Sequence, residues 1–291
     1  MVALTESCNF ESENIDCVST LKMMQIINNE DKKVALAVET QLESIANAVD
    51  LIVEQFWKWW SLIYFGAGTS WRIWVLDASE CPPTYSVDPH LVQGIIAWGD
   101  TAIRTSLEGA EDSYEWWQKD ADILAENDVA VVISASWNPK YLLGIIDKAR
   151  EKHAKLIWLT CNPQGNICDK VDILICPQVG AEVIAWSSRM KAGTAQKMVL
   201  NMLSTGTMIK IGKTYKNLMV DLHVSNEKLK KRAISLISTI AKVPYDVAEN
   251  SLNKSNGEVK TAIVSLIKSV TVDVARILLD EKKGILREVI G

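Results

Sequence analysis

Apolar and polar positions divide the chain into a helical start, an alternating middle and a helical end. Residues 19–56 show helical spacing, with Ser19 and Thr20 capping a first helix and a second helix expected from about Asp31. Five short apolar runs without polar alternation follow, separated by helical stretches such as residues 139–154. Such continuous Val, Ile and Leu runs are typical of strands buried on both faces. The runs are 61–68, 94–98, 128–136, 155–162 and 172–178.

Strand–helix alternation at this spacing predicts an α/β fold, a doubly wound parallel sheet flanked by helices. From residue 187 the pattern is helical only, and the last segments predict a small three-helix module. We therefore expect three parts: an N-terminal helical segment over 1–50, an α/β domain over 51–215, and a helical region over 216–291 that ends in that module.

Composition narrows the classes of function. The 291 residues are 48% apolar, enough for a sizeable core, and the net charge of −5 argues against a nucleic-acid partner. Apolar runs are too short for a membrane span. The 6 cysteines show no CxxC spacing, which favours reduced thiols and a cytoplasmic protein, and the 3 histidines show no zinc-ligand spacing.

Two hydroxyl-rich turns follow predicted strands. Gly68, Thr69 and Ser70 come after the first strand, and Ser134 and Ser136 come after the third. In an open parallel sheet, ligands bind beyond the carboxyl ends of the strands, where free N–H groups and short hydroxyls suit a phosphate. A structural N-cap is the alternative for each turn. The first turn is not GxGxxG, so a dinucleotide site is disfavoured.

Two glutamates and two cations are further candidates. Glu80, in "DASECPPT", is expected in a loop made rigid by two prolines, and Glu111, in "LEGAEDS", in a second loop. A lone loop glutamate is usually solvated, so the two become an acid/base pair only if they face one pocket. Arg189 and Lys191, in "SSRMKAGT", are candidates for phosphate or carboxylate contacts, with a solvated helix N-terminus as the alternative.

Several motifs resemble those of a known family. "LIYFGAGTS", "VLDASECPPT", "EGAED", "SSRMKAGTAQKMVLNMLSTG" and "NLMVD" are similar to motifs of the N-acetylmuramic acid 6-phosphate etherases, within the sugar-isomerase (SIS) superfamily of phosphosugar-binding domains. The resemblance covers nearly the whole chain. It implies cleavage of the lactyl ether of N-acetylmuramic acid 6-phosphate to N-acetylglucosamine 6-phosphate and D-lactate. The implied reaction is elimination followed by addition of water, without a metal or organic cofactor.

The same resemblance implies roles for individual residues. Glu80 takes the role of proton donor and Glu111 the partner acid/base role, while the hydroxyl-rich turns hold the phosphosugar. The implied phosphosugar contacts are Gly68, Thr69, Ser70, Ser134, Ser136, Arg189 and Lys191. The family further implies a homodimer with sites near the subunit interface. The terminal module resembles a ubiquitin-associated-like helical fold without implying ubiquitin binding.

Tryptophans mark the departure from this family. The chain has 11, and most of them stand where the etherases have glycine. These are Trp59, Trp60, Trp71, Trp74, Trp98, Trp116, Trp117, Trp137, Trp158 and Trp186. An indole blocks the close backbone approach and positive φ that glycine permits. We hypothesise that these positions are encoded by UGA, which some bacterial lineages read as glycine and a common alternative translation table writes as tryptophan. The other interpretation is a non-catalytic phosphosugar-binding or regulatory protein with an altered pocket.

Overall fold

The computed structural model describes residues 4–66, 69–96, 114–135, 140–162, 170–222, 224 and 226–291, with backbone only at 69–71, 96, 115–116 and 140–141. The chain forms two compact units. One comprises Met1–Ser79 and Pro89–Ser204, and the other Glu80–Asp88 and Thr205–Gly291. The domain boundaries expected from the sequence stay a prediction.

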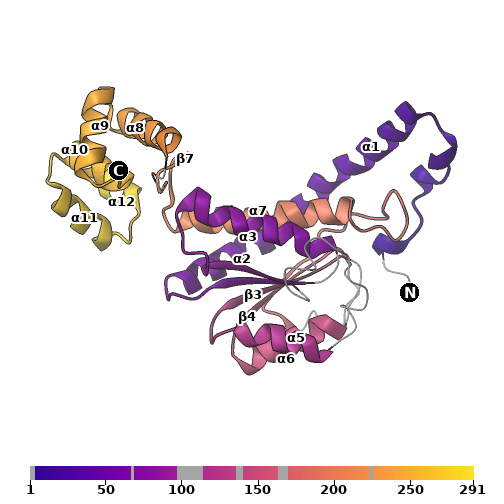
Figure 1. Ribbon diagram of the computed structural model, residues 1–291. Helices are drawn as coiled ribbons and strands as arrows, with labels where there is room; N and C mark the ends of the chain where they lie inside the picture. Colours follow the sequence, from indigo (N-terminus) through magenta and orange to yellow (C-terminus); the bar gives the residue numbers. More distant parts are fainter. Residues whose placement is uncertain are drawn as a thin grey trace. The chain divides into compact units, whose positions relative to one another are not determined.

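The first unit is built on a five-stranded sheet in which every pairing is parallel (Figure 1). The strand order is β2-β1-β3-β4-β5, a doubly wound arrangement that confirms the predicted fold class. All five apolar runs overlap a strand, although β2 begins two residues before its run. The strands are β1 (Leu62–Gly66), β2 (Val92–Ile96), β3 (Val129–Ser134), β4 (Lys155–Thr160) and β5 (Ile173–Ile175).

Helices cover both faces of this sheet (Figure 1). On one face lie α2 (Leu42–Phe56), α3 (Thr69–Tyr85) and α7 (Lys191–Lys210), and on the other lie α5 (Tyr114–Asp120) and α6 (Lys140–Glu151). Successive strand residues therefore enter different cores, and β1 and β3 are buried along their whole length. A short 3₁₀ turn, Ala121–Ile123, follows α5.

Two of the tryptophans belong to the core on the α5–α6 face. Trp117 and Trp158 are each 1% exposed and pack in one apolar cluster with Phe65 and Ile146. Trp158 lies in a strand, as its apolar run predicts. The turn-like neighbours of the tryptophans favour a loop at Trp117, and that expectation is wrong because Trp117 lies in α5. Their burial between the sheet and its helices offers a large apolar contact area instead.

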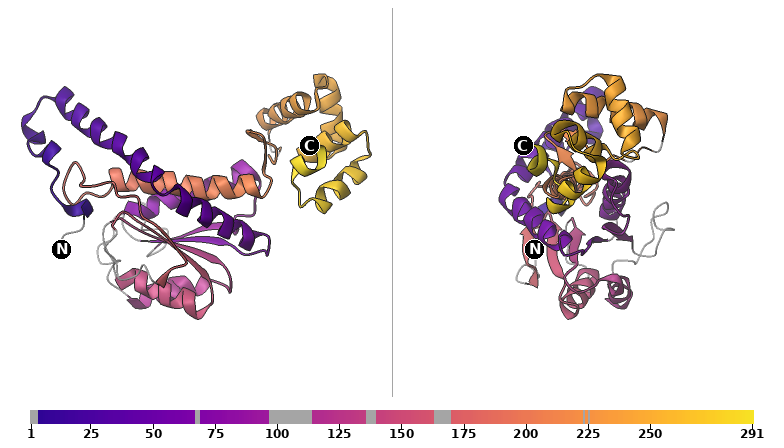
Figure 2. Two further views of the ribbon diagram at one scale, coloured as in Figure 1. Left: turned by 180° about the vertical axis from the view of Figure 1, so that it is seen from behind. Right: turned by 90° about the vertical axis from the view of Figure 1, so that its left-hand side faces the viewer.

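The N-terminal part holds three 3₁₀ turns, Leu4–Glu6, Phe10–Ser12 and Ile15–Cys17, and then α1 (Thr20–Glu39). The Oγ of Ser19 accepts a hydrogen bond from the Lys22 N–H at 3.4 Å, which confirms the predicted cap. The expected helix start near Asp31 is wrong, because α1 is continuous there and the break falls at Thr40–Gln41. The polar residues before Asp31 do not mark a helix boundary, since the Glu30 side chain is buried and pairs with the buried Lys191. Figure 2 shows α1 running out from the sheet.

The second unit contains a hairpin and five helices. The hairpin pairs β6 (Thr214–Tyr215) with β7 (Leu218–Met219), so the expectation of helix only after residue 187 is wrong at this point. The five helices share one apolar core that includes Ile237, Ile263 and Leu286, and the core is thus larger than a three-helix module. They are α8 (Glu227–Ala241), α9 (Tyr245–Lys254), α10 (Val259–Lys268), α11 (Val272–Glu281) and α12 (Leu286–Ile290).

Neither unit offers a membrane span. Throughout the ranges that the structure describes, the helices lack the length and apolar character that a bilayer crossing requires.

Candidate active site

The carboxyl ends of β1 and β3, which the two hydroxyl-rich turns follow in the sequence, lie at one edge of the sheet. β1 ends at Gly66, which pairs with Ile133, and the next residue of β3 is Ser134, which pairs with Thr160. Thr69 begins α3, so the free N–H groups of the α3 N-terminus lie at this edge. This arrangement suits an anionic group such as a phosphate. Of the predicted phosphosugar contacts, Gly68 and Ser136 lie outside the described residues, and the side chains of Thr69 and Ser70 are not described.

Ser134 is the predicted contact at this edge whose side chain the structure describes. It is 8% exposed, and its Oγ accepts a hydrogen bond from the indole Nε1 of Trp158 at 3.2 Å. Because Ser134 Oγ is the acceptor in this hydrogen bond, its own O–H remains available as a donor. A hydroxyl held in this way can serve an anion at the strand ends.

Glu80 lies in a helix and not in a loop, so that sequence expectation is wrong. It is an exposed residue of α3, which continues through Pro82 and Pro83 to Tyr85. The prolines fall in the last turns, where each removes one intrahelical hydrogen bond while the rest of the helix persists. Glu80 follows Thr69 by eleven residues, a separation of about 16 Å along the axis at 1.5 Å per residue. Glu111 lies outside the described residues.

Asp77, one helical turn before Glu80, is a buried carboxylate that sequence reasoning missed. It is 6% exposed and accepts hydrogen bonds from Tyr64, Asn201 and Ser204. Burial raises the pKa of Asp77, although the hydrogen bonds from Asn201, Ser204 and Tyr64 act in the opposite direction. The sequence signal was present: an acidic residue on the same helical face as the apolar residues of α3 needs a polar partner.

The two predicted cations differ sharply in exposure. Arg189 is exposed, whereas Lys191 is 1% exposed and its Nζ lies 2.6 Å from Glu30 Oε2. The N-terminus of α7 is also occupied, because the Glu182 carboxylate accepts the N–H groups of Lys191 and Ala192 at 2.9 Å each. Burial raises the pKa of Glu182 despite these two hydrogen bonds. The protein therefore supplies its own carboxylate at the α7 N-terminus, and the assignment of Arg189 and Lys191 to the phosphosugar stays a prediction.

Three tryptophans occupy positions with the properties of glycine sites. Trp59 and Trp186 have φ of 68° and 64° and side chains that are 93% and 77% exposed. A bulky residue in the left-handed region is an outlier, and these indoles gain almost no burial in return. Trp74 is fully buried, yet its indole N–H has no hydrogen-bond partner among the described residues.

Trp74 also crowds the strand ends. A Cβ added to Gly66 would lie 2.5 Å from Cη2 of Trp74, and one added to Gly94 would lie 2.6 Å from its Cδ1. The indole thus fills the space directly over two glycines of β1 and β2. A glycine at position 74 would leave that space open.

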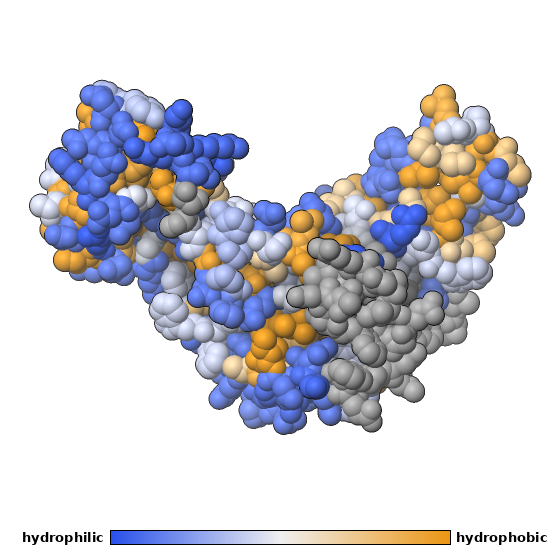
Figure 3. Space-filling model, in the orientation of Figure 1, coloured by the Kyte–Doolittle hydropathy of each residue, from blue (hydrophilic) through white to orange (hydrophobic). Residues whose placement is uncertain are grey.

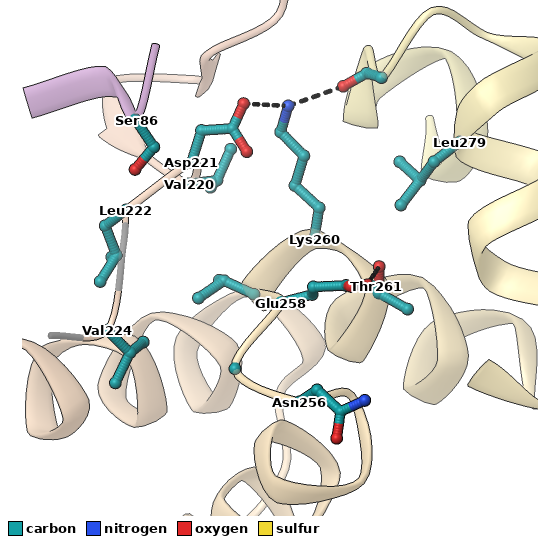
Figure 4. A pocket seen from close by; sticks show the side chains of 13 residues that line it. Ser86, Val220, Asp221, Leu222, Val224, Asn256, Glu258, Lys260, Thr261 and Leu279 are labelled. Atoms are coloured by element: carbon teal, nitrogen blue, oxygen red, sulfur yellow. Dashed lines mark hydrogen bonds and ion pairs between the residues drawn. The ribbon is translucent and has the colours of Figure 1, made fainter. Parts of the chain in front are cut away.

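A separate cavity of about 500 Å³ lies within the second unit (Figure 4). Lys260 points across it and donates to Asp221 and to the carbonyl of Gly284, both at 2.8 Å, while Lys213 Nζ lies 2.9 Å from the same Asp221 carboxylate. Burial lowers the pKa of Lys260, although the Asp221 carboxylate opposes this shift. None of the predicted site residues is among its described lining residues.

Comparison with known proteins agrees with this fold. Residues 44–150 match the glucokinase regulatory protein N-terminal SIS domain, residues 103–206 the SIS domain, and residues 216–260 the C-terminal lid domain of glucokinase regulatory protein. A solved phosphoheptose isomerase from Neisseria gonorrhoeae superposes with a TM-score of 0.50 at 17% identity, over 65% of this chain and 98% of that one. The protein is therefore of the SIS-domain class.

Its relatives define the family within that class. A curated N-acetylmuramic acid 6-phosphate etherase of Caldanaerobacter subterraneus is 50% identical over 99% of this chain and 94% of its own length. One from Photobacterium profundum is 48% identical over 99% of this chain and 96% of its own length. This chain belongs to the N-acetylmuramic acid 6-phosphate etherase family, which confirms the family resemblance found in its motifs.

Proposed function

We propose that this protein is an enzyme, a carbon–oxygen lyase that cleaves the lactyl ether of N-acetylmuramic acid 6-phosphate. The products are N-acetylglucosamine 6-phosphate and D-lactate. The observation that carries this proposal is the 50% identity with the Caldanaerobacter etherase over 99% of the chain. The compared 289 residues leave almost none of this chain out, and in this sequence the two glutamates stand in "DASECPPT" and "EGAED".

The proposed chemistry needs one base and one acid. The base removes the proton next to the carbonyl of the ring-opened sugar, the carbon–oxygen bond to lactate breaks as the double bond forms, and the acid protonates the departing lactate oxygen. Water then adds to the double bond. We assign proton donation to Glu80 and the partner role to Glu111. The phosphate binds at the carboxyl edge of the sheet, at the N-terminus of α3 and the Ser134 hydroxyl.

We further propose that the protein works in the cytoplasm as a homodimer. The first 3₁₀ turns and α1 expose large apolar side chains, Phe10 at 88%, Leu21 at 70% and Met24 at 48%, and apolar surface gathers over this part of the chain in Figure 3. Contiguous exposed apolar surface is typical of an interface. We assign this surface to a second copy of the chain.

The decisive experiment measures D-lactate release from N-acetylmuramic acid 6-phosphate. It compares the printed sequence with a version in which glycine replaces the tryptophans at family glycine positions. We expect release by the glycine version, and a loss of at least about 100-fold in kcat for Glu80→Gln in that background. Glu43→Gln, on α2, is the control and keeps full activity. Absence of lactate from both parent versions contradicts the proposed reaction.

The second candidate is a non-catalytic phosphosugar-binding protein. The buried Trp74 indole, which fills the space over Gly66 and Gly94, favours this candidate because it alters the strand ends where the phosphate is expected. Calorimetric titration with the sugar phosphate separates the two candidates. Binding by both versions without lactate release supports the non-catalytic candidate.

A further inference from the structure

Asp77 joins three segments of the first unit at one buried carboxylate. Its Oδ1 accepts hydrogen bonds from Asn201 Nδ2 at 2.6 Å and from Ser204 Oγ at 2.9 Å, both on α7. Its Oδ2 accepts one from the Tyr64 hydroxyl at 3.0 Å, on β1. One side chain of α3 is therefore held by strand β1 of the sheet and by helix α7.

Two of the three partners are as well shielded as Asp77 itself, whereas Asn201 is half-buried. Tyr64 is 0% exposed and Ser204 is 3% exposed. Hydrogen bonds to an ionised carboxylate are shorter and stronger than those between neutral groups, and low surrounding polarity strengthens them. Apolar contacts of Trp74 and Ala78 alone allow a helix to slide or turn, whereas three directed bonds fix both its rotation and its axial position.

Glu80 depends on that rotation because it lies three residues after Asp77 on the same helix. A side chain at the rim of an α-helix sits about 5–6 Å from the axis, so a turn of about 20° moves it by about 2 Å. Displacements of about 1 Å from reacting geometry can lower a rate by about 100-fold. A local loosening of α3 at Asp77 would thus displace an acid at position 80, three residues away, more than the helix N-terminus at Thr69, eight residues away.

We propose that Asp77 is a positioning residue for catalysis: its buried contacts with Tyr64, Asn201 and Ser204 fix α3 and so aim the Glu80 carboxyl at the leaving oxygen. This inference rests on the proposed function, in which Glu80 is the proton donor. Asp77 itself touches no substrate.

The test compares two buried carboxylates of the same unit. Asp77→Asn removes the charge that Asn201, Ser204 and Tyr64 recognise. Asp128→Asn is the matched control, because Asp128 is 5% exposed and accepts the N–H groups of Ser61 and Ala125, two residues outside α3, at 2.8 Å each. Thermal unfolding, kcat and KM for D-lactate release are measured for each variant, in whichever parent version is active.

We expect both variants to lower Tm, and Asp77→Asn alone to lower kcat, by about 10- to 100-fold with KM changed less than about twofold. The exchanged pair Asp77→Asn with Asn201→Asp restores an amide–carboxylate hydrogen bond and recovers most of the kcat. If Asp77→Asn keeps the kcat of its parent while Tm falls as in Asp128→Asn, Asp77 is structural only and the inference is wrong. An inactive parent contradicts the proposed function instead.

Discussion

The ammonium of Lys191 lies 2.6 Å from the carboxylate of Glu30, with side chains only 2% and 3% exposed. Without Lys191, the buried Glu30 carboxylate keeps only the exposed Lys33 as a partner. Loss of one partner of a buried pair costs about 3–5 kcal/mol. We therefore expect Lys191→Met to lower the free energy of unfolding by that amount in urea titrations. Lys33→Met is the control, since Lys33 contacts the same carboxylate from a 54% exposed position, and such pairs contribute about 1 kcal/mol or less.

The same pair gives stability that depends on pH. Burial tends to raise the pKa of Glu30, but hydrogen bonds from Lys191 and Lys33 outweigh it and hold that pKa below its ordinary value. An acid with a lowered folded pKa contributes fully above its unfolded pKa of about 4.3 and loses the contribution as pH falls further. Glu30→Gln should therefore unfold with a weaker pH dependence below about pH 4.3 than the parent. If urea titrations below about pH 4.3 show the same pH dependence of the unfolding free energy in Glu30→Gln and the parent, Glu30 is not the group responsible.

Asp120, at the end of α5, gives a pH dependence of stability opposite to that of Glu30. Burial raises its pKa to about 6, with Lys119 acting weakly against the shift. Between the unfolded pKa of about 3.9 and about 6, the folded state binds more protons than the unfolded chain, so stability falls as pH rises through this window. Asp120→Asn should remove this decline. Unfolding free energies measured from pH 4 to 7 that keep the parental slope in the variant would refute it.

Replacing Trp59 or Trp186 with glycine should stabilise the protein. Left-handed backbone costs a residue with a Cβ about 1–2 kcal/mol, so Trp59→Gly and Trp186→Gly should each raise the free energy of unfolding by about 1 kcal/mol. Trp57→Gly is the matched control, because Trp57 has a right-handed φ of −66° at the end of α2. There glycine adds its backbone entropy and removes a half-buried indole, so it should destabilise by at least about 0.5–1 kcal/mol.

A double-mutant cycle can isolate the crowding by Trp74. An added Cβ at Gly94 has only Trp74 atoms as its three nearest neighbours, whereas one at Gly66 also lies 2.7 Å from the Ile133 carbonyl oxygen. We expect Gly94→Ala to cost about 1–3 kcal/mol beside Trp74 and close to zero with Trp74→Gly. Gly66→Ala should remain destabilising in both backgrounds. Equal costs for Gly94→Ala in the two backgrounds would show that Trp74 does not occupy this space.

The UGA hypothesis is tested at the gene and in the native protein. We expect UGA codons at the family glycine positions, and a native mass lower than that of the printed chain by one tryptophan-to-glycine difference per position. Reading the codons for Trp71, Trp74 and Trp137 is sufficient. UGG at those three positions would falsify the hypothesis and make the altered pocket a property of the protein itself.

Local patterns were enough to predict the parallel α/β fold. Each of the five apolar runs overlaps a strand, since a strand that is buried on both faces has a continuous run of apolar residues. The Ser19 cap is equally local, as its acceptor and donor are three residues apart. The local prediction of a loop at Glu80 was wrong. Two adjacent prolines favour a loop, but here they lie in the last turns of a packed helix.

The pairing of distant segments was decided by the tertiary structure alone. Lys191 joins Glu30 across 161 positions, and Asn201 joins Asp77 across 124. In the sequence each of these four residues is an ordinary polar residue of an amphipathic helix. Because a buried charge is tolerated only beside its partner, and the partner is brought there by the packing of α1, α3 and α7, the folded chain determines which polar residues are structural and which remain free to act on a substrate.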